Sequence, residues 1–297
     1  MKVKALITLP RFHFIPLSLN MTSLGAFIAL REGVFSFPIY ILTLIGVVLS
    51  HMATNILNDY HDYKDGIDIS TTRTPFSGGS GVLTAGFLSA KQALFIGLCS
   101  LFLAGLIGIY FVIRTGIALL PLILLAGISI YFYNTFFSKR IMGEFIAGFN
   151  FGPLLVLGAY FVQTGHYSIE ALVASLAPGI LTSNLLLVNE FPDAEADKKG
   201  GRKHFVISLG KKKAAYLAVF LITLSYLLIV LGVIVNNMPV WTLLALLTVM
   251  IGIKTAKGVI RDHEGIKEFI PTMGKNVITV LSTQALIALG YLIAVFT

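Results

Sequence analysis

The stretch "FPIYILTLIGVVLSHMATNILNDYHDYKDGID", residues 37–68, joins a long apolar run to a dense group of aspartates. Its apolar part is long enough for a helix to cross the ~30 Å hydrocarbon core of a bilayer. Carboxylates on one helical face repel one another unless a cation neutralises them. The stretch therefore predicts a membrane-spanning helix that ends in a cation-binding site.

The composition extends the membrane prediction to the whole chain. Of 297 residues, 56% are hydrophobic and only 12% are charged, whereas a soluble domain carries about 25% charged residues. The mean hydropathy is +0.88. Because helices satisfy their backbone hydrogen bonds internally in lipid, we expect an all-α integral membrane protein with nine transmembrane helices in one bundle, forming a single domain over 1–297. The predicted spans are 12–30, 36–57, 92–113, 115–136, 143–163, 168–190, 214–235, 238–256 and 276–296.

Positive charge is distributed unevenly between the two sides of this predicted bundle. The N-terminal tail and the loops after the second, fourth, sixth and eighth spans hold 20 of the 22 Lys and Arg residues, and only Arg31 and Arg114 fall on the other side. Lys and Arg concentrate in cytoplasmic loops. We therefore expect a multi-pass protein of the cell membrane with a cytoplasmic N-terminus and an outside C-terminus. The same asymmetry explains the net charge of +8, so we do not expect nucleic-acid binding.

The first acidic cluster has the spacing of one helical face. Four of its polar residues recur every three or four positions and share a stripe if the helix continues through them. Gly66 allows a turn that would bring Asp68 back toward this stripe, whereas Asp65 is an extra carboxylate. The residues on the stripe are Asn55, Asn58, Asp59 and Asp62.

A second acidic cluster lies at the end of the sixth predicted span, in "NEFPDAEADKKGGRKHF", residues 189–205. Asp193 and Asp197 have the i, i+4 spacing that places two side chains on one helical face. Hard oxygen ligands select Mg²⁺ or Ca²⁺ over zinc, and Mg²⁺ commonly fills its remaining positions with water and substrate phosphate oxygens. Two facing clusters with interleaved Lys and Arg therefore predict a diphosphate site at the cytoplasmic side.

A weak internal similarity supports the expectation that the clusters face each other. Each is followed by a Gly-containing polar stretch, SGGSG at 77–81 and KKGGRK at 198–203, and then by "SAKQAL" or "GKKKAAY". If the halves are duplicates, the clusters occupy equivalent positions across one cavity.

A lipid with a diphosphate head and a polyisoprene tail fits such a site. Mg²⁺ and cationic side chains would stabilise the departing diphosphate. Aromatic side chains, as in "YFYNTFF" at 131–137, could stabilise the resulting allylic carbocation and shield it from water.

These motifs resemble those of the UbiA superfamily of intramembrane prenyltransferases, and the resemblance covers essentially the whole chain. It is greatest to the branch that prenylates 1,4-dihydroxy-2-naphthoate in menaquinone synthesis. "NDYHDYKDGID" has that branch's N-D-Y-x-D-x-x-x-G-x-D spacing, "GEFIAGFNFGPLLVLGAYFVQTG" (143–165) follows its G-E…F-G-P…G-x-Y…Q-T pattern, and "DAEADKKGGRKHFVISLG" (193–210) matches most of D-x-x-x-D-x-x-x-G-K-x-T-x-x-x-x-L-G. The chain departs from the branch at NEFPD, in place of N-N-x-R-D, and at His204, in place of Thr.

The resemblance implies an enzyme that transfers a polyprenyl group from a polyprenyl diphosphate to an aromatic acceptor. The carboxylates Asp59, Asp62, Asp193 and Asp197 would be catalytic. Two Mg²⁺ ions would be held by Asn58, Asp59, Asp62, Asp68, Asp193 and Asp197. Further substrate contacts would come from Asn55, Asn58, Arg73, Tyr131, Tyr133, Lys139, Arg140, Lys198 and Lys203.

Two alternatives share part of this pattern. A superfamily enzyme with another acceptor, such as 4-hydroxybenzoate, a prenyl-glycerol phosphate or haem, would have the same metal chemistry. A transporter with a divalent-cation site would also place carboxylates in a membrane bundle, although such sites usually lie at the midplane rather than at one face. The tail length, a coupled decarboxylation and the oligomeric state are not specified by these motifs.

Overall fold

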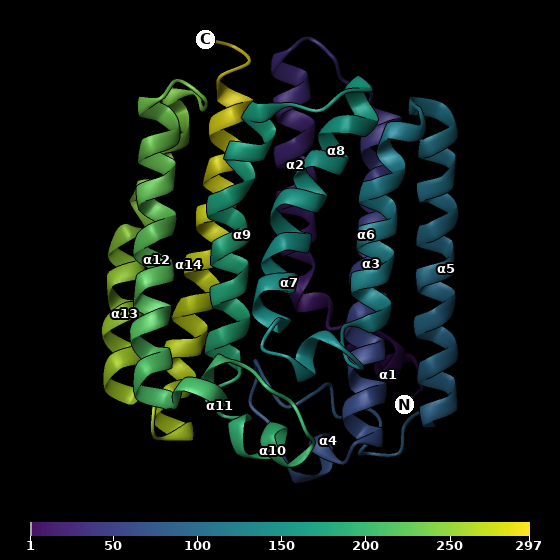
Figure 1. The fold of residues 1–297 in the computed structure, drawn as a ribbon, viewed down its shortest axis with the longest axis vertical. Coiled ribbons are helices and arrows are strands. Elements are labelled where there is room, and N and C mark those ends of the chain that lie inside the picture. The colour runs from purple at the N-terminus through teal and green to yellow at the C-terminus, as the bar shows by residue number, and fades with distance from the viewer. Residues whose placement is uncertain (1) are drawn as a thin grey trace.

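Long helices run side by side along a common axis and build the bundle shown in Figure 1. The computed structural model describes residues 2–297, and no strand occurs in that part of the chain. Eight helical stretches there are long and apolar enough to cross a membrane. They are Ala5–Arg31, Phe37–Lys64, Ala90–Thr115, Gly143–Thr164, Ile169–Asn189, Lys211–Ile234, Val240–Asp262 and Ile266–Ile293.

The predicted span 115–136 corresponds to a shorter apolar helix, Ile117–Phe132, so nine full-length spans are not present among residues 2–297. Gly116, at φ 110°, separates this helix from the preceding one. At its other end the chain leaves helical geometry after Phe132 and forms a turn. The predicted start at 115 agrees with the break at Gly116, whereas the predicted end at 136 lies beyond the helix, because the turn after Phe132 is still rich in aromatic residues.

The helices divide into long elements that form the bundle and short ones that cap one end. In Figure 1, α12, α13 and α14 lie on one side, α3, α5 and α6 on the other, and α2 and α7–α9 between them. The α-helices are α1 (Lys2–Thr8), α2 (Ile15–Arg31), α3 (Phe37–Lys64), α4 (Ile67–Ser70), α5 (Ala90–Thr115), α6 (Leu120–Phe132), α7 (Gly143–Phe149), α8 (Leu155–Thr164), α9 (Ile169–Asn189), α10 (Ala194–Lys199), α11 (Phe205–Leu209), α12 (Lys211–Ile234), α13 (Val249–Asp262) and α14 (Ile266–Ile293). A π-helical turn, Asn150–Leu154, joins α7 to α8, and 3₁₀ turns cover Phe12–Phe14, Ile117–Leu119, Phe137–Lys139 and Val240–Thr248.

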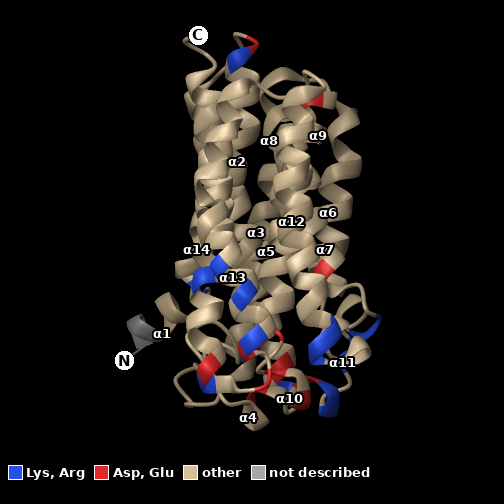
Figure 2. Ribbon diagram, turned by 90° about the vertical axis from the view of Figure 1, so that its left-hand side faces the viewer, with Lys and Arg blue, Asp and Glu red and all other residues tan. Residues whose placement is uncertain are grey.

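Most of the charged residues gather at one end of the bundle. Figure 2 shows Asp, Glu, Lys and Arg concentrated around α4, α10 and α11, with few at the opposite end, where the chain finishes. At that opposite end, Arg31 pairs with Glu170 at 2.7 Å. The arrangement agrees with the charge asymmetry found in the sequence and leaves long apolar helix faces between the two ends.

Close backbone contact fixes α9 against the helix that contains the π-helical turn. A Cβ added to Gly152 would lie 2.6 Å from the Gly179 Cα and 2.8 Å from the Ser175 carbonyl oxygen. Pro153 lies within the π-helical turn, and proline lacks the N–H that regular helical bonding requires. Glycines at this crossing therefore let two helices approach closely, as small residues commonly do in membrane bundles.

Replacing Gly152 by Ala should destabilise the protein by about 1–3 kcal/mol, because the new methyl group would overlap backbone atoms. The thermal unfolding midpoint in detergent would measure this loss. Gly105→Ala, on α5, is the matched control because no atom lies within 4 Å of its Cβ position. Equal midpoints for the two variants would contradict the close packing.

Candidate active site

The first acidic cluster lies on the last turns of α3, which continues past its apolar part to Lys64. Asp59 is only 1% exposed. Its carboxylate contacts the Arg11 guanidinium at 2.5 Å and accepts a hydrogen bond from the backbone N–H of Ser80 at 3.0 Å. Asp62 is also buried. The predicted continuation of the helix is therefore confirmed, and both carboxylates point into the protein.

A glycine turn after α3 brings a third carboxylate into the same region. Gly66 adopts φ 78° and starts α4, on which Asp68 is buried. The following loop approaches closely, since a Cβ on Gly79 would lie 2.5 Å from an Asp68 carboxylate oxygen. Asp65, by contrast, lies at the surface and pairs with Lys139 at 3.3 Å. The predicted return of Asp68 is confirmed.

The second acidic cluster begins where α9 ends and continues on α10. Asp193 precedes α10, and Asp197 is buried on it. The Asp193 carboxylate accepts hydrogen bonds from the backbone N–H of Gly78 at 3.0 Å and from the Ser77 hydroxyl at 3.2 Å. Because Ser77 and Gly78 belong to the loop that follows the first cluster, the second acidic segment is in direct contact with that loop.

Arg202 connects the two clusters through its guanidinium group. It forms an ion pair with Asp62 of the first cluster, and its Nε lies 3.7 Å from an Asp197 oxygen of the second. All three side chains are largely buried. A buried carboxylate is strongly unfavourable unless it is paired, so Arg202 and Arg11 each neutralise part of the acidic region.

Asp68 and Asp193 have no ion pair with an arginine among the described residues. Burial, and next the nearby carboxylates, raise the pKa of Asp68 and that of Asp193 to about 7 in each case. A divalent cation would neutralise this uncompensated charge. The donors are carboxylate oxygens, which are the ligands that Mg²⁺ prefers. The residues present therefore fit a magnesium site.

A cavity of about 350 Å³ connects the acidic region to the apolar interior. From its charged end it continues between α3, α5, α6 and α8 to Phe111, Leu119 and Val162, near the opposite end of the bundle. Its wall is therefore polar at one end and apolar along its length. The charged and amide residues of the wall are Arg11, Asn55, Asn58, Asp62, Asp68, Asn150, Asn189, Glu190, Asp193, Asp197 and Arg202.

Most of the residues expected in the two acidic clusters meet at this cavity, but Asp59 does not line it. The Asn58 amide donates to Asn134 Oδ1 at 2.8 Å, and the Asn55 amide donates to the Pro10 carbonyl at 2.8 Å. Arg73 lies at a smaller adjacent pocket and donates to the Ser80 carbonyl at 2.5 Å. The expected residues that line the main cavity are Asn55, Asn58, Asp62, Asp68, Tyr133, Asp193 and Asp197.

Besides Arg73, five expected substrate contacts do not line the main cavity. Tyr131 is 55% exposed on the outer face of α6. The Arg140 guanidinium lies over the Phe136 ring, 3.8 Å from its centre. The surface pair with Asp65 holds Lys139 away. The remaining two are the exposed residues Lys198 and Lys203. Their positions follow from the turn geometry around α6 and α10, which sequence spacing did not define.

Arg11 and Arg202 were not predicted as site residues, although they make the principal ion pairs of the cavity. Both lie in segments rich in cations, where positive charge is already explained by topology. For Arg202 a signal existed, because it occupies the Lys position of the G-K-x-T pattern. Arg11 has a left-handed backbone, φ 56°, between α1 and α2, and no motif at this position indicated a site residue.

The fold and the site together define a helical membrane protein with a buried acidic centre at one end of an apolar cavity. Residues 19–270 match the model of the UbiA prenyltransferase family. The chain belongs to this family and is a prenyltransferase, as the resemblance of its motifs predicted.

Relatives and a solved structure extend over nearly the whole chain. The 1,4-dihydroxy-2-naphthoate octaprenyltransferase of Bacillus subtilis is 28% identical, covering 97% of this chain and 92% of that protein. The 1,4-dihydroxy-2-naphthoate octaprenyltransferase of Escherichia coli is 27% identical, covering 93% of this chain and 91% of that protein. The structure of an Archaeoglobus fulgidus UbiA homologue bound to GPP and Mg²⁺ has a TM-score of 0.57 at 15% identity, covering 95% of this chain and 99% of that one.

The raised pKa values of Asp68 and Asp193 predict how stability depends on pH. A carboxyl group that holds its proton more tightly when folded stabilises the protein below its ordinary pKa, and this contribution is lost as pH rises through about 7. Without divalent cations, the thermal unfolding midpoint should therefore decrease as the pH is raised from about 5 to about 8. Added Mg²⁺ should raise the midpoint most at the higher pH, where the carboxyl groups are ionised.

Asp193→Asn should weaken both the pH dependence and the Mg²⁺ effect. Asp65→Asn is the matched control, because Asp65 lies at the surface. The prediction fails if Mg²⁺ raises the midpoints of the wild type and Asp193→Asn by the same amount at high pH.

Proposed function

We propose that this prenyltransferase moves a polyprenyl group from a polyprenyl diphosphate to an aromatic acceptor, 1,4-dihydroxy-2-naphthoate. The observation that carries the proposal is the meeting of two acidic segments, joined by Arg202, at the charged end of an otherwise apolar cavity. The choice of acceptor is supported by the relatives from Bacillus subtilis and Escherichia coli, which are both 1,4-dihydroxy-2-naphthoate octaprenyltransferases.

The acidic end of the cavity would bind the diphosphate through two Mg²⁺ ions. The Archaeoglobus fulgidus homologue, which shares the fold, was solved with GPP and Mg²⁺. When bound, Mg²⁺ would neutralise charge that develops on the leaving diphosphate. Arg11 and Arg202 would pair with neighbouring carboxylates and contact phosphate oxygens that extend beyond the metals. The proposed metal ligands are Asn58, Asp59, Asp62, Asp68, Asp193 and Asp197.

The apolar length of the cavity would hold the tail and exclude water. The allylic carbon–oxygen bond breaks with its electron pair leaving on the diphosphate. A ring carbon of the acceptor then bonds to the allylic carbon and loses its proton or carboxyl group. Tyr133, which lines the cavity, would stabilise positive charge through its π face.

The charge distribution supports an orientation with the acidic end in the cytoplasm. Figure 2 shows that end carrying nearly all the charged residues, including the basic ones. Basic residues flank membrane helices on the cytoplasmic side. The enzyme would therefore be a multi-pass protein of the cell membrane, a single domain over 1–297, whose active site takes its diphosphate from the cytoplasmic side.

Diphosphate release by the purified protein should require Mg²⁺, a polyprenyl diphosphate and an acceptor. Asp193→Asn should lower turnover by about 100-fold or more, since charge stabilisation on the leaving group is lost. Asp65→Asn should retain activity. Turnover that persists in the presence of a chelator would refute the metal role.

The same assay distinguishes acceptors when its products are identified by mass. Naphthoate, 4-hydroxybenzoate and a prenyl-glycerol phosphate would be compared at equal concentrations, and naphthoate should give the product. Product formation only with another acceptor would overturn the acceptor assignment without changing the reaction class.

Gly158→Phe should shift the preference toward shorter prenyl diphosphates. Gly158 lines the cavity on α8 with no atom within 4 Å of its Cβ position, so a phenyl group would occupy space available to the tail. Gly127→Phe is the control, because Gly127 has equal room but does not line the cavity. Comparison of kcat/KM for geranyl and longer diphosphates measures the shift, and an unchanged ratio would contradict the tail placement.

A further inference from the structure

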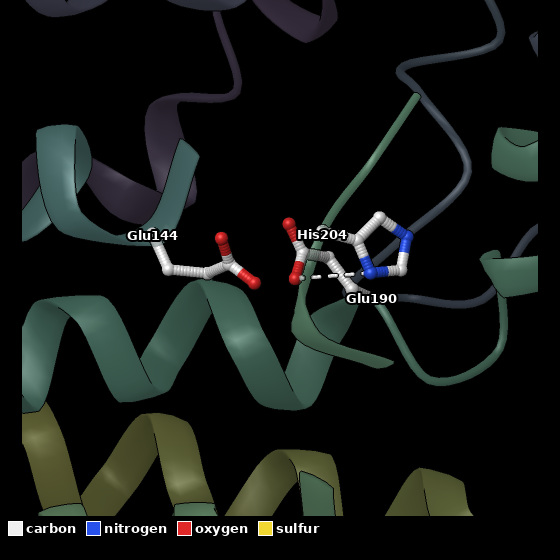
Figure 3. Close-up of side chains that lie close together, drawn as sticks. All are labelled: Glu144, Glu190 and His204. Atoms are coloured by element: carbon white, nitrogen blue, oxygen red, sulfur yellow. Dashed lines mark ion pairs between the residues drawn. The ribbon is translucent and has the colours of Figure 1, made fainter. Parts of the chain in front are cut away.

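A second group of buried titratable side chains lies beside the diphosphate region. Glu144 is on α7, Glu190 follows α9, and His204 precedes α11; they are 2%, 7% and 3% exposed. Figure 3 shows the two carboxyl groups facing each other and the His204 ring facing Glu190. One possible ligand atom from each residue lies within 4.8 Å of the other two.

Several polar atoms of this group have no hydrogen-bond partner among the described residues. Glu144 accepts a hydrogen bond from the Phe205 backbone N–H at 2.8 Å through Oε1, but its Oε2 is unpaired. Glu190 Oε2 and both ring nitrogens of His204 are also unpaired. A buried polar atom that nothing contacts is unfavourable, because it has lost its hydrogen bonds to water.

The nearest groups lie at ion-pair distances rather than in hydrogen-bond geometry. His204 Nδ1 is 3.6 Å from Glu190 Oε2 (Figure 3), and Nε2 is 3.3 Å from an Asp197 oxygen. Burial, and next the neighbouring Glu144 carboxyl, raise the pKa of Glu190 well above its ordinary value. Two carboxyl groups this close require either a shared proton or a cation between them.

The ligand types favour a transition metal over magnesium. Zinc binds imidazole nitrogen and carboxylate oxygen at about 2.0–2.2 Å, usually with four ligands. Mg²⁺, in contrast, takes oxygen ligands and retains water. Ligand atoms around zinc lie roughly 3.3 Å apart at these bond lengths. Side-chain movements of about 1 Å would therefore close the group around an ion.

We propose that Glu144, Glu190 and His204 bind a divalent ion of the zinc class at a site separate from the Mg²⁺ that accompanies the diphosphate. Three protein ligands leave a position for water or for an anionic oxygen of a molecule in the cavity, which Glu190 lines. Glu190 and His204 are also positions at which the chain departs from the naphthoate-branch pattern, where Asn and Thr stand. The site does not depend on the proposed reaction.

Metal content tests the site directly. The full-length protein in detergent would be incubated with zinc sulfate, without any prenyl diphosphate, then desalted and analysed for zinc by mass spectrometry. Wild type should retain about one zinc per chain, whereas His204→Ala and Glu190→Gln should lose most of it. Asp193→Asn and His263→Ala should retain zinc, because one alters only the diphosphate region and the other a histidine outside the group.

Three outcomes would overturn the proposal. The first is that folded wild type retains no zinc, which would favour a shared proton. The second is that His204→Ala retains as much zinc as wild type. The third is that Asp193→Asn loses as much zinc as His204→Ala. A zinc K-edge X-ray absorption spectrum of wild type tests the ligands even if the variants do not fold. It should show one imidazole nitrogen with oxygen ligands, and a spectrum of oxygen ligands alone would contradict the assignment.

Discussion

The buried ion pairs of Arg202 with Asp62 and Asp197 are the contacts on which the site depends. They join the end of α3 to α10, two segments far apart in the sequence, at the charged end of a membrane bundle. Removing one partner of a buried pair leaves an uncompensated charge, which commonly costs about 3–5 kcal/mol. Arg11 forms a similar buried ion pair with Asp59. These arginines give the buried carboxylates Asp59, Asp62 and Asp197 a compensating positive charge.

The ion pairs set a gradient of polarity along the cavity. At one end, Asp68 and Asp193 lack an arginine partner among the described residues and would attract a divalent cation. Farther along, the wall becomes apolar. Gly78 and Gly79 let the intervening loop approach both acidic segments. A ligand with a diphosphate head and an apolar tail matches this gradient in order and in chemistry. The gradient therefore connects the fold to the proposed reaction.

Sequence patterns predicted the helical bundle, the acidic stripe and the return of Asp68 at Gly66, because each depends on local periodicity or on one special residue. They did not predict which cations turn inward. Arg202 and Lys203 are neighbours in a basic loop, yet one is buried in the site and the other is exposed. Tyr131 and Tyr133 likewise differ, since Tyr131 is exposed and Tyr133 lines the cavity. The group of Glu144, Glu190 and His204 was also missed, since its members come from three separate segments that only the tertiary fold brings together.

We expect the two acidic segments to hold a diphosphate through a divalent ion. Electron–nuclear double resonance can detect this arrangement, with Mn²⁺ replacing Mg²⁺ and geranyl diphosphate bound. Wild type should show phosphorus couplings from a directly coordinated diphosphate, and Asp62→Asn should lose them. Mn²⁺ bound without phosphorus coupling, while the diphosphate is shown to be bound, would contradict it.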